Sequence, residues 1–145
     1  MEFALVIPLL LLLAFAVVQY GYMLSFRQAL SQAAAEGARA AAVSPFPSAG
    51  DKESAALGAV NDALAVKAYG VTCSGAAAGS PLKRGGDTVG TCSVVTAACA
   101  QEPTTDCVTV SLDYWYEDHP MLPEVTGVSL LLPEHLTYDA TARSS

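Results

Sequence analysis

Charged side chains are absent from the stretch that runs from Phe3 to Phe26. Its only polar side chains are Gln19, Tyr20, Tyr22 and Ser25. At a rise of 1.5 Å per residue, this stretch makes a helix of roughly 36 Å, enough to cross a hydrocarbon core of about 30 Å. A helix in the core of a soluble domain is rarely apolar on every side over such a length. The stretch is therefore predicted to span a membrane.

Motifs for catalysis or cofactor binding are also missing. The glycine-rich run Lys83-Arg84-Gly85-Gly86-Asp87 lacks the spacing of a phosphate-binding loop, so it is expected to be part of a mobile hairpin connection, 74–90. Asp118, His119 and Glu124 lie in one proline-punctuated loop without a third partner at matching spacing. We expect no catalytic residues, no metal site and no cofactor, and interpret the chain as a building unit rather than an enzyme.

Basic residues are scarce, with 7 lysines and arginines against 14 acidic residues. Through residue 43, Arg27 and Arg39 balance Glu2 and Glu36, so the whole net charge of −7 falls on residues 44–145. An acidic surface repels nucleic acid and anionic lipid. Nucleic acid is therefore not an expected partner.

The apolar stretch continues without an obvious break into a segment of strong helix formers, Arg27 to Val43, and proline is absent until Pro45. One continuous helix of about 40 residues, near 60 Å long, is the simplest prediction. Pro8 leaves two possibilities: the helix begins around it, or a short leading turn is kinked there. The chain thus divides into a membrane and assembly helix, 1–43, and a head domain, 44–145.

Small residues recur at every fourth position of this helix: Gly21, Ser25, Ala29, Ala33, Gly37 and Ala41. Such a row lets a neighbouring helix approach closely, and it favours helices that cross at an angle. The alternative is an alanine-rich helix that lies on its own head domain. The two interpretations are compatible.

The four cysteines all lie in the head, at Cys73, Cys92, Cys99 and Cys107. Their separations of 19, 7 and 8 residues contain no Cys-x-x-Cys pair, so zinc binding is only a weak alternative. An even count beyond a membrane segment indicates two disulfides in an oxidising compartment. Three pairings are possible, and we favour Cys73–Cys92 with Cys99–Cys107 because each links neighbouring strands or a local loop.

The head reads as a helix followed by strands. A turn at 44–50 precedes a helix from Lys52 to Tyr69, capped by Asp51 and closed by Gly70. The helix is expected to pack on a sheet through Leu57, Val60, Leu64 and Ala68. Strands are expected at 71–73, 91–96, 108–116 and 135–142, with a polar loop between Cys99 and Cys107. The predicted fold is α+β, a long N-terminal helix followed by a small head with a second helix and an antiparallel sheet of about four strands.

Alternation assigns the two faces of the last strands. Val108, Val110, Leu112, Tyr114 and Tyr116 should face the core, as should Leu136, Tyr138, Ala140 and Ala142. Trp115 then points outward, either as a contact site or covered by the following loop.

The helix also carries motifs that identify a family. These are Glu2-Phe3-Ala4-Leu5-Val6, Pro8 before a leucine run, Gly21, Arg27-Gln28-Ala29-Leu30 and Glu36-Gly37-Ala38-Arg39-Ala40-Ala41. They resemble the opening of TadE-like pilins of the tight-adherence system, small type IV-type pilins of bacteria, over about 42 residues. The tyrosine-rich strand, the Pro-Leu-Pro loop and the closing strand resemble the family's head more loosely.

The resemblance implies a precursor held in the cytoplasmic membrane, a leader removed by a prepilin peptidase, and assembly by the pilus machinery through the N-terminal helices. Assembly residues are then Met1, Glu2, Phe3 and Pro8, together with the small-residue row. Glu2 is expected to pair with the α-ammonium of a neighbouring subunit, or else to stay in the headgroup region. Type IV pilins commonly carry this glutamate five residues into the mature chain, whereas here it is second.

The orientation in the membrane depends on the same region. Because only Met1 and Glu2 precede the apolar run, the charge rule by itself would leave the head inside the cell, against the cysteine argument. A basic leader that has been cleaved would reconcile them and give a cytoplasmic N-terminus with the head outside.

Three functions are open at this point. The leading one is a structural pilus subunit at the cell surface, which contacts lipid before assembly and sister pilins afterwards. The second is a membrane-anchored accessory protein of pilus assembly or secretion that never polymerises. The third is an anchored binding domain that uses Trp115 and the proline loop.

Overall fold

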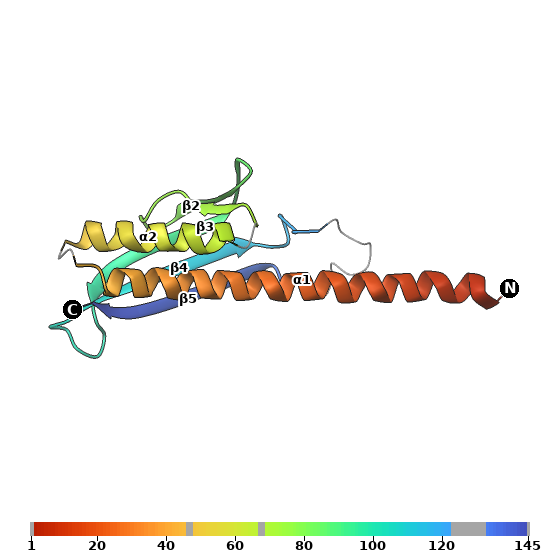
Figure 1. Ribbon diagram of the computed structural model, residues 1–145, viewed down its shortest axis with the longest axis horizontal. Helices are drawn as coiled ribbons and strands as arrows, with labels where there is room; N and C mark the ends of the chain where they lie inside the picture. Colours follow the sequence, from red (N-terminus) through yellow and green to blue (C-terminus); the bar gives the residue numbers. More distant parts are fainter. Residues whose placement is uncertain (1, 46–47, 67–68, 123–132, 145) are drawn as a thin grey trace.

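One long helix and one shorter helix lie on a five-stranded sheet in the computed structural model, which describes residues 2–45, 48–66, 69–122 and 133–144 (Figure 1). The long helix α1 runs from Glu2 to Ala42 over 41 residues. The single continuous helix predicted from the sequence is therefore confirmed. Pro8 lies inside it, so the possibility that the helix begins around Pro8 is wrong. The missing N–H of this proline leaves one carbonyl of the leading turn without its helical partner.

The second helix, α2, runs from Ala49 to Val66 and starts three residues before the predicted position. Its N-cap is Ser48 rather than Asp51. The Ser48 Oγ accepts the backbone N–H of Asp51 at 3.2 Å and donates to the Asp51 carboxylate at 2.6 Å. The predicted C-terminal end at Tyr69 is also wrong, since Tyr69 lies beyond the helix, while Gly70 has a positive φ of 67°. Ala68 lies outside the described residues.

The sheet is antiparallel throughout, with the strands in the order β1-β2-β3-β4-β5. They are β1 Val71–Cys73, β2 Ser80–Arg84, β3 Asp87–Ala98, β4 Asp106–Trp115 and β5 His135–Ser144. The sequence predicts about four strands, and the structure has five. The additional strand is β2, which lies inside the segment interpreted as a connection. Gly85 and Gly86, both at positive φ, form the turn that joins β2 to β3.

Both helices cover the same face of the sheet, side by side (Figure 1). The rear half of α1 packs on β4 and β5, and α2 packs on β1 and β3. The inward alternation predicted for β4 is confirmed, since every second side chain from Val108 to Tyr116 is buried. On β5, Leu136 is buried, and Tyr138, Ala140 and Ala142 pack partly buried against the same core. On the opposite face, β4 and β5 carry mainly serine, threonine and charged side chains, together with Trp115, and β3 exposes Val95.

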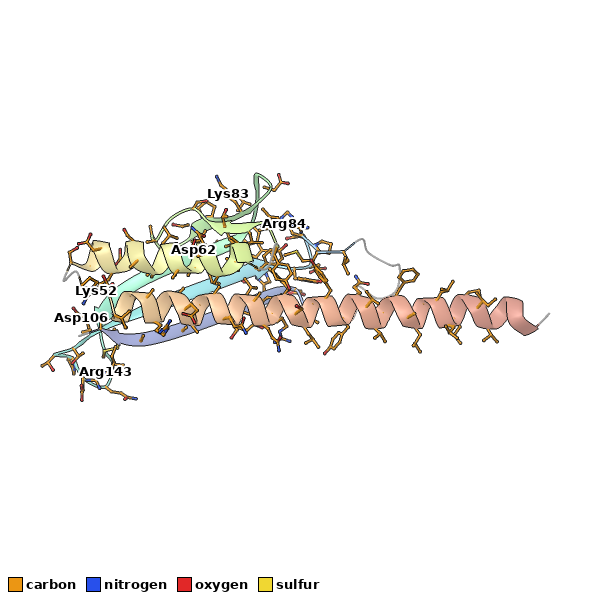
Figure 2. All side chains as sticks on the ribbon, in the orientation of Figure 1. Lys52, Asp62, Lys83, Arg84, Asp106 and Arg143 are labelled. Atoms are coloured by element: carbon orange, nitrogen blue, oxygen red, sulfur yellow. A yellow bond between two sulfur atoms is a disulfide. The ribbon has the colours of Figure 1, made fainter. Side chains whose placement is uncertain are left out.

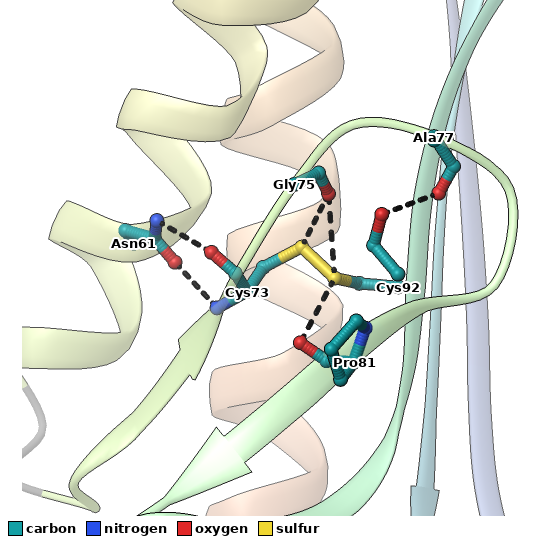
Figure 3. The surroundings of a disulfide bond; sticks show 7 residues. Asn61, Cys73, Gly75, Ala77, Pro81 and Cys92 are labelled. Carbon is teal, nitrogen blue, oxygen red and sulfur yellow. Dashed lines mark hydrogen bonds between the residues drawn. A yellow bond between two sulfur atoms is a disulfide. The ribbon is translucent and has the colours of Figure 1, made fainter.

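Two disulfides staple the head, with the favoured pairing Cys73–Cys92 and Cys99–Cys107. The first joins β1 to β3 across β2, with Cα atoms 6.0 Å apart. Asn61 of α2 secures the same place, as Figure 3 shows: its side-chain amide donates to the Cys73 carbonyl at 3.1 Å, and its oxygen accepts the Cys73 N–H at 2.7 Å. β1 is an edge strand of only three residues, so its pairing with β2 alone gives it little stability. The disulfide and the two hydrogen bonds from Asn61 therefore fix it to the rest of the head.

Candidate functional site

The candidate site is α1, because its two halves have different surroundings. In Figure 1 the N-terminal half projects from the head as a single rod, whereas the rear half lies between α2 and β5. In this view, side chains of the projecting half extend from both edges of the rod, with no other described helix or strand beside them (Figure 2). Burial of α1 within the protein begins at Gln19, which is 4% exposed, and continues at Met23, which is 2% exposed, and at Phe26, which is fully buried.

The projecting half displays a continuous apolar surface. Its large exposed side chains are Val6, Ile7, Leu9, Leu10, Leu11, Leu12, Leu13, Phe15, Val17, Val18, Tyr20, Tyr22 and Leu24. By length and composition, α1 is long and apolar enough to cross a membrane, and only 11% of its most apolar window is buried within the protein. Leaving this surface in water would cost on the order of 10 kcal/mol or more. The rod therefore requires lipid or protein around it.

The small-residue row is divided between the two halves of α1. Ala29, Ala33 and Ala41 are at most 2% exposed and Gly37 is buried, so these positions pack within the chain. The alternative of a helix that lies on its own head therefore describes the rear half. Gly21 is exposed, and a Cβ there would have no neighbour within 4 Å.

Gly37 marks the closest approach of α1 to the head. A Cβ at this position would lie 2.5 Å from Val60 Cγ2, 3.2 Å from the Ala56 carbonyl oxygen and 3.4 Å from Val110 Cγ2. Only a residue without a side chain lets α1 settle this deeply between α2 and β4. The close helix–helix contact that the row predicts is thus made inside the chain at Gly37.

An aromatic cluster holds α1 where it leaves the head. The Phe26 ring packs edge-on against Tyr69 and Tyr114, with centroids 4.9 and 4.7 Å apart, and Tyr22 packs on Tyr69 at 5.8 Å. Ser25 belongs to this cluster through a 2.9 Å hydrogen bond between its Oγ and the Tyr69 hydroxyl. The sequence predicts Tyr69 as the last residue of α2, not as part of this cluster. Its role here could not be read from the sequence, because no local pattern pairs it with Phe26.

Burial changes the acidity of two tyrosines near this cluster. It raises the pKa of Tyr114, whose hydroxyl donates to the His119 carbonyl at 2.7 Å. Burial also raises the pKa of Tyr116, as does the neighbouring Tyr114. Both phenols remain neutral well past physiological pH.

The remaining predicted assembly residues lie at the N-terminus. Met1 lies outside the described residues. Glu2 and Phe3 belong to the first turn of α1, and their side chains are not among those described. Pro8 is in the second turn. The structure thus brings together the buried part of the row and leaves Gly21 on the free rod.

The loop residues considered for chemistry do not form a site in the described part of the chain. Lys83 and Arg84 belong to β2 (Figure 2). The Arg84 guanidinium donates to the Pro120 carbonyl at 3.4 Å. His119 donates its backbone N–H to the carbonyl of Trp115, whose side chain is half-buried, and Glu124 is outside the described residues. Among the residues described, no three His, Cys, Asp or Glu side chains gather as metal ligands.

Comparison with known families agrees with this emphasis on α1. Residues 1–39 match the family model described as TadE-like protein. These residues of the N-terminal helix are thus similar to the TadE-like family. The resemblance found in its sequence is confirmed over the helix, and it fits a membrane-anchored, pilus-associated protein of a generally structural family. No curated protein and no solved structure matches the chain.

Proposed function

We propose that this TadE-like chain is a structural subunit of a bacterial type IV-type, Tad-like pilus. The projecting half of α1 is held in the cytoplasmic membrane before assembly and packs against sister helices in the filament. The acidic, disulfide-stapled head faces outward. The observation that carries the proposal is a helix whose rear half is covered by its own head while its apolar front half is covered by nothing described.

Two physical points support polymerisation through the front half. Lipid tails are as apolar as leucine, so helices associate in a membrane through close packing rather than through the hydrophobic effect. Gly21 offers the open notch that such packing uses, since a Cβ there would meet nothing within 4 Å. The four buried positions of the row fix the head to the helix instead, so every subunit presents its rod in the same way.

In this proposal the N-terminus and the head lie on opposite sides of the membrane. A prepilin peptidase removes a basic leader, and the N-terminus stays on the cytoplasmic side while the head crosses to the oxidising side, where its two disulfides persist. Glu2 then pairs with the α-ammonium of a neighbouring subunit, which offsets the cost of a carboxylate beside apolar side chains. The rod leaves the membrane when contacts with sister helices replace contacts with lipid.

The test is electron microscopy of filaments sheared from cells, with peptide identification of this chain in them. Gly21→Ile should abolish filaments while the precursor still accumulates in the membrane, because a branched side chain fills the notch. Gly58→Ile is the matched control: Gly58 is an exposed helical glycine of α2 that also has no neighbour within 4 Å. Filaments should persist in this control.

The results also separate the proposal from its alternatives. Membrane-bound chain with no filament containing it would favour a non-polymerising accessory protein and refute the subunit role. Normal filaments in Gly21→Ile would refute the notch but leave the subunit role in place. Intact filaments in Glu2→Ala would refute the pairing of Glu2.

A further inference from the structure

At the point where α1 leaves the head, an open groove of about 480 Å³ lies between the helix and β5. Its lining consists of Leu24, Arg27, Gln28, Ser31, Gln32 and Tyr138. We infer that this groove binds the phosphate of a phospholipid headgroup at the outer face of the membrane. The inference rests on the proposed membrane-held precursor, and it assigns to Arg27 a role that is independent of filament packing.

The position of Arg27 sets the depth of the groove. It is the first charged side chain after the uncharged stretch 3–26, whose length matches the hydrocarbon core, so Arg27 falls at the boundary of the bilayer. Tyr20 and Tyr22, 52% and 38% exposed, precede it within two turns. Exposed tyrosines of this kind are typical of the headgroup level of membrane proteins.

The chemistry of the groove suits a phosphate. Arg27 Nε donates to the Tyr138 hydroxyl at 2.7 Å, which holds the guanidinium against β5. No other protein hydrogen bond is described for this guanidinium, so its terminal nitrogens are available to a ligand. A guanidinium binds phosphate oxygens through two parallel hydrogen bonds.

The rest of the lining decides between a lipid and a free anion. Among the described residues that line the groove, Arg27 is the only charged one, and the amides and hydroxyl of Gln28, Ser31 and Gln32 supply neutral polar groups. Leu24 lines the membrane side and is 40% exposed, continuous with the apolar rod. A lipid can place its phosphate on Arg27 and an acyl chain along this rod, whereas inorganic phosphate has no apolar part that could contact the rod.

The test uses the full-length chain in phospholipid nanodiscs. Native mass spectrometry counts the lipids that stay bound to the chain after it is released from the nanodisc. Arg27→Gln should lower lipid retention by roughly tenfold, the factor expected for the loss of one charge-assisted hydrogen bond. Arg27→Lys should fall between, because it keeps the charge and loses the two-pronged geometry. Arg39→Gln is the control, since Arg39 is exposed on the same helix about 18 Å farther along and pairs with Glu36.

Three results would overturn the inference. The first is equal retention in Arg27→Gln and the wild type. The second is equal retention of a neutral glycolipid that lacks phosphate. The third is displacement of lipid by millimolar inorganic phosphate, which would identify a free-anion site. Protease protection of the helix is measured in parallel: a wild-type chain that stays outside the bilayer refutes the membrane-held precursor as well, whereas normal insertion with unchanged retention refutes only the groove.

Discussion

Gly37 and Gly21 belong to the same row of small residues, and the structure predicts opposite effects of alanine at the two positions. At Gly37 the new Cβ would lie 2.5 Å from Val60 Cγ2, closer than such atoms approach without a shift, and 3.2 Å from a backbone oxygen of α2. Val60 is 1% exposed and β-branched, so it has little freedom to turn away. At Gly21 the Cβ meets nothing within 4 Å.

The magnitudes decide the sign in each case. Overpacking a well-packed core costs about 1–3 kcal/mol, and a Cβ 2.5 Å from a buried β-branched side chain belongs at the upper end, about 2–3 kcal/mol, while replacing a helical glycine by alanine gains up to about 1 kcal/mol. Gly37→Ala should therefore lower the free energy of unfolding by about 1–2 kcal/mol. Gly21→Ala should leave it unchanged or raise it by up to about 1 kcal/mol. For a head domain of this size, the Gly37 change corresponds to a Tm lower by roughly 5–15 °C.

The assay is thermal unfolding of the full-length chain in detergent micelles, followed by near-ultraviolet circular dichroism and the fluorescence of Trp115. A double-mutant cycle adds a sharper control. Since Val60→Ala removes the opposing methyl groups, the cost of Gly37→Ala should shrink by about 1 kcal/mol in that background. A Gly37→Ala chain as stable as the wild type, or additive costs in the cycle, would refute the close approach of α1 to α2.

Three further predictions concern the head. Gly90→Ala places a Cβ against the Asp113 carbonyl oxygen and should break the pairing of β3 with β4, lowering the urea midpoint by the equivalent of about 3 kcal/mol or more; an unchanged midpoint would refute the tight contact. Asn61→Ala removes both hydrogen bonds to the backbone of β1 and should cost about 1–3 kcal/mol, with faster amide exchange in β1 than in β4. Because burial raises the pKa of Tyr114 and Tyr116, stability is fully present below the ordinary tyrosine pKa of 10.0 and is lost as pH rises through the higher folded values. Alkaline titration at 295 nm should show late ionisation that coincides with unfolding, and early ionisation of all tyrosines in a folded chain would contradict this.

Local sequence was sufficient for the features that depend on local physics. An uncharged run followed by strong helix formers determines one long helix, whatever surrounds it, because every backbone group is satisfied within the helix. Alternation from Val108 to Tyr116 determined which side of β4 is buried, because successive side chains of a strand point to opposite faces. Cysteine spacing favoured the observed pairing, although only Cys99–Cys107 closes a local loop as expected, whereas Cys73–Cys92 joins β1 and β3, which are not neighbours because β2 lies between them.

Other features depended on contacts between distant segments. The strand β2 contains a proline and borders a glycine-rich turn, and it becomes a strand only because β1 and β3 pair with its two edges. The start of α2 depended on which of two nearby polar side chains, Ser48 or Asp51, turned to the free N–H groups.

The fate of the small-residue row shows the same division. Spacing along the chain determined that one side of α1 permits close approach, but periodicity carries no information about which partner takes that side. In the tertiary structure, the head of the same chain covers the rear of the row, and Gly21 remains exposed. The physical reason is that a helix face is defined by local geometry, whereas its covering is chosen by whichever distant surface buries it best.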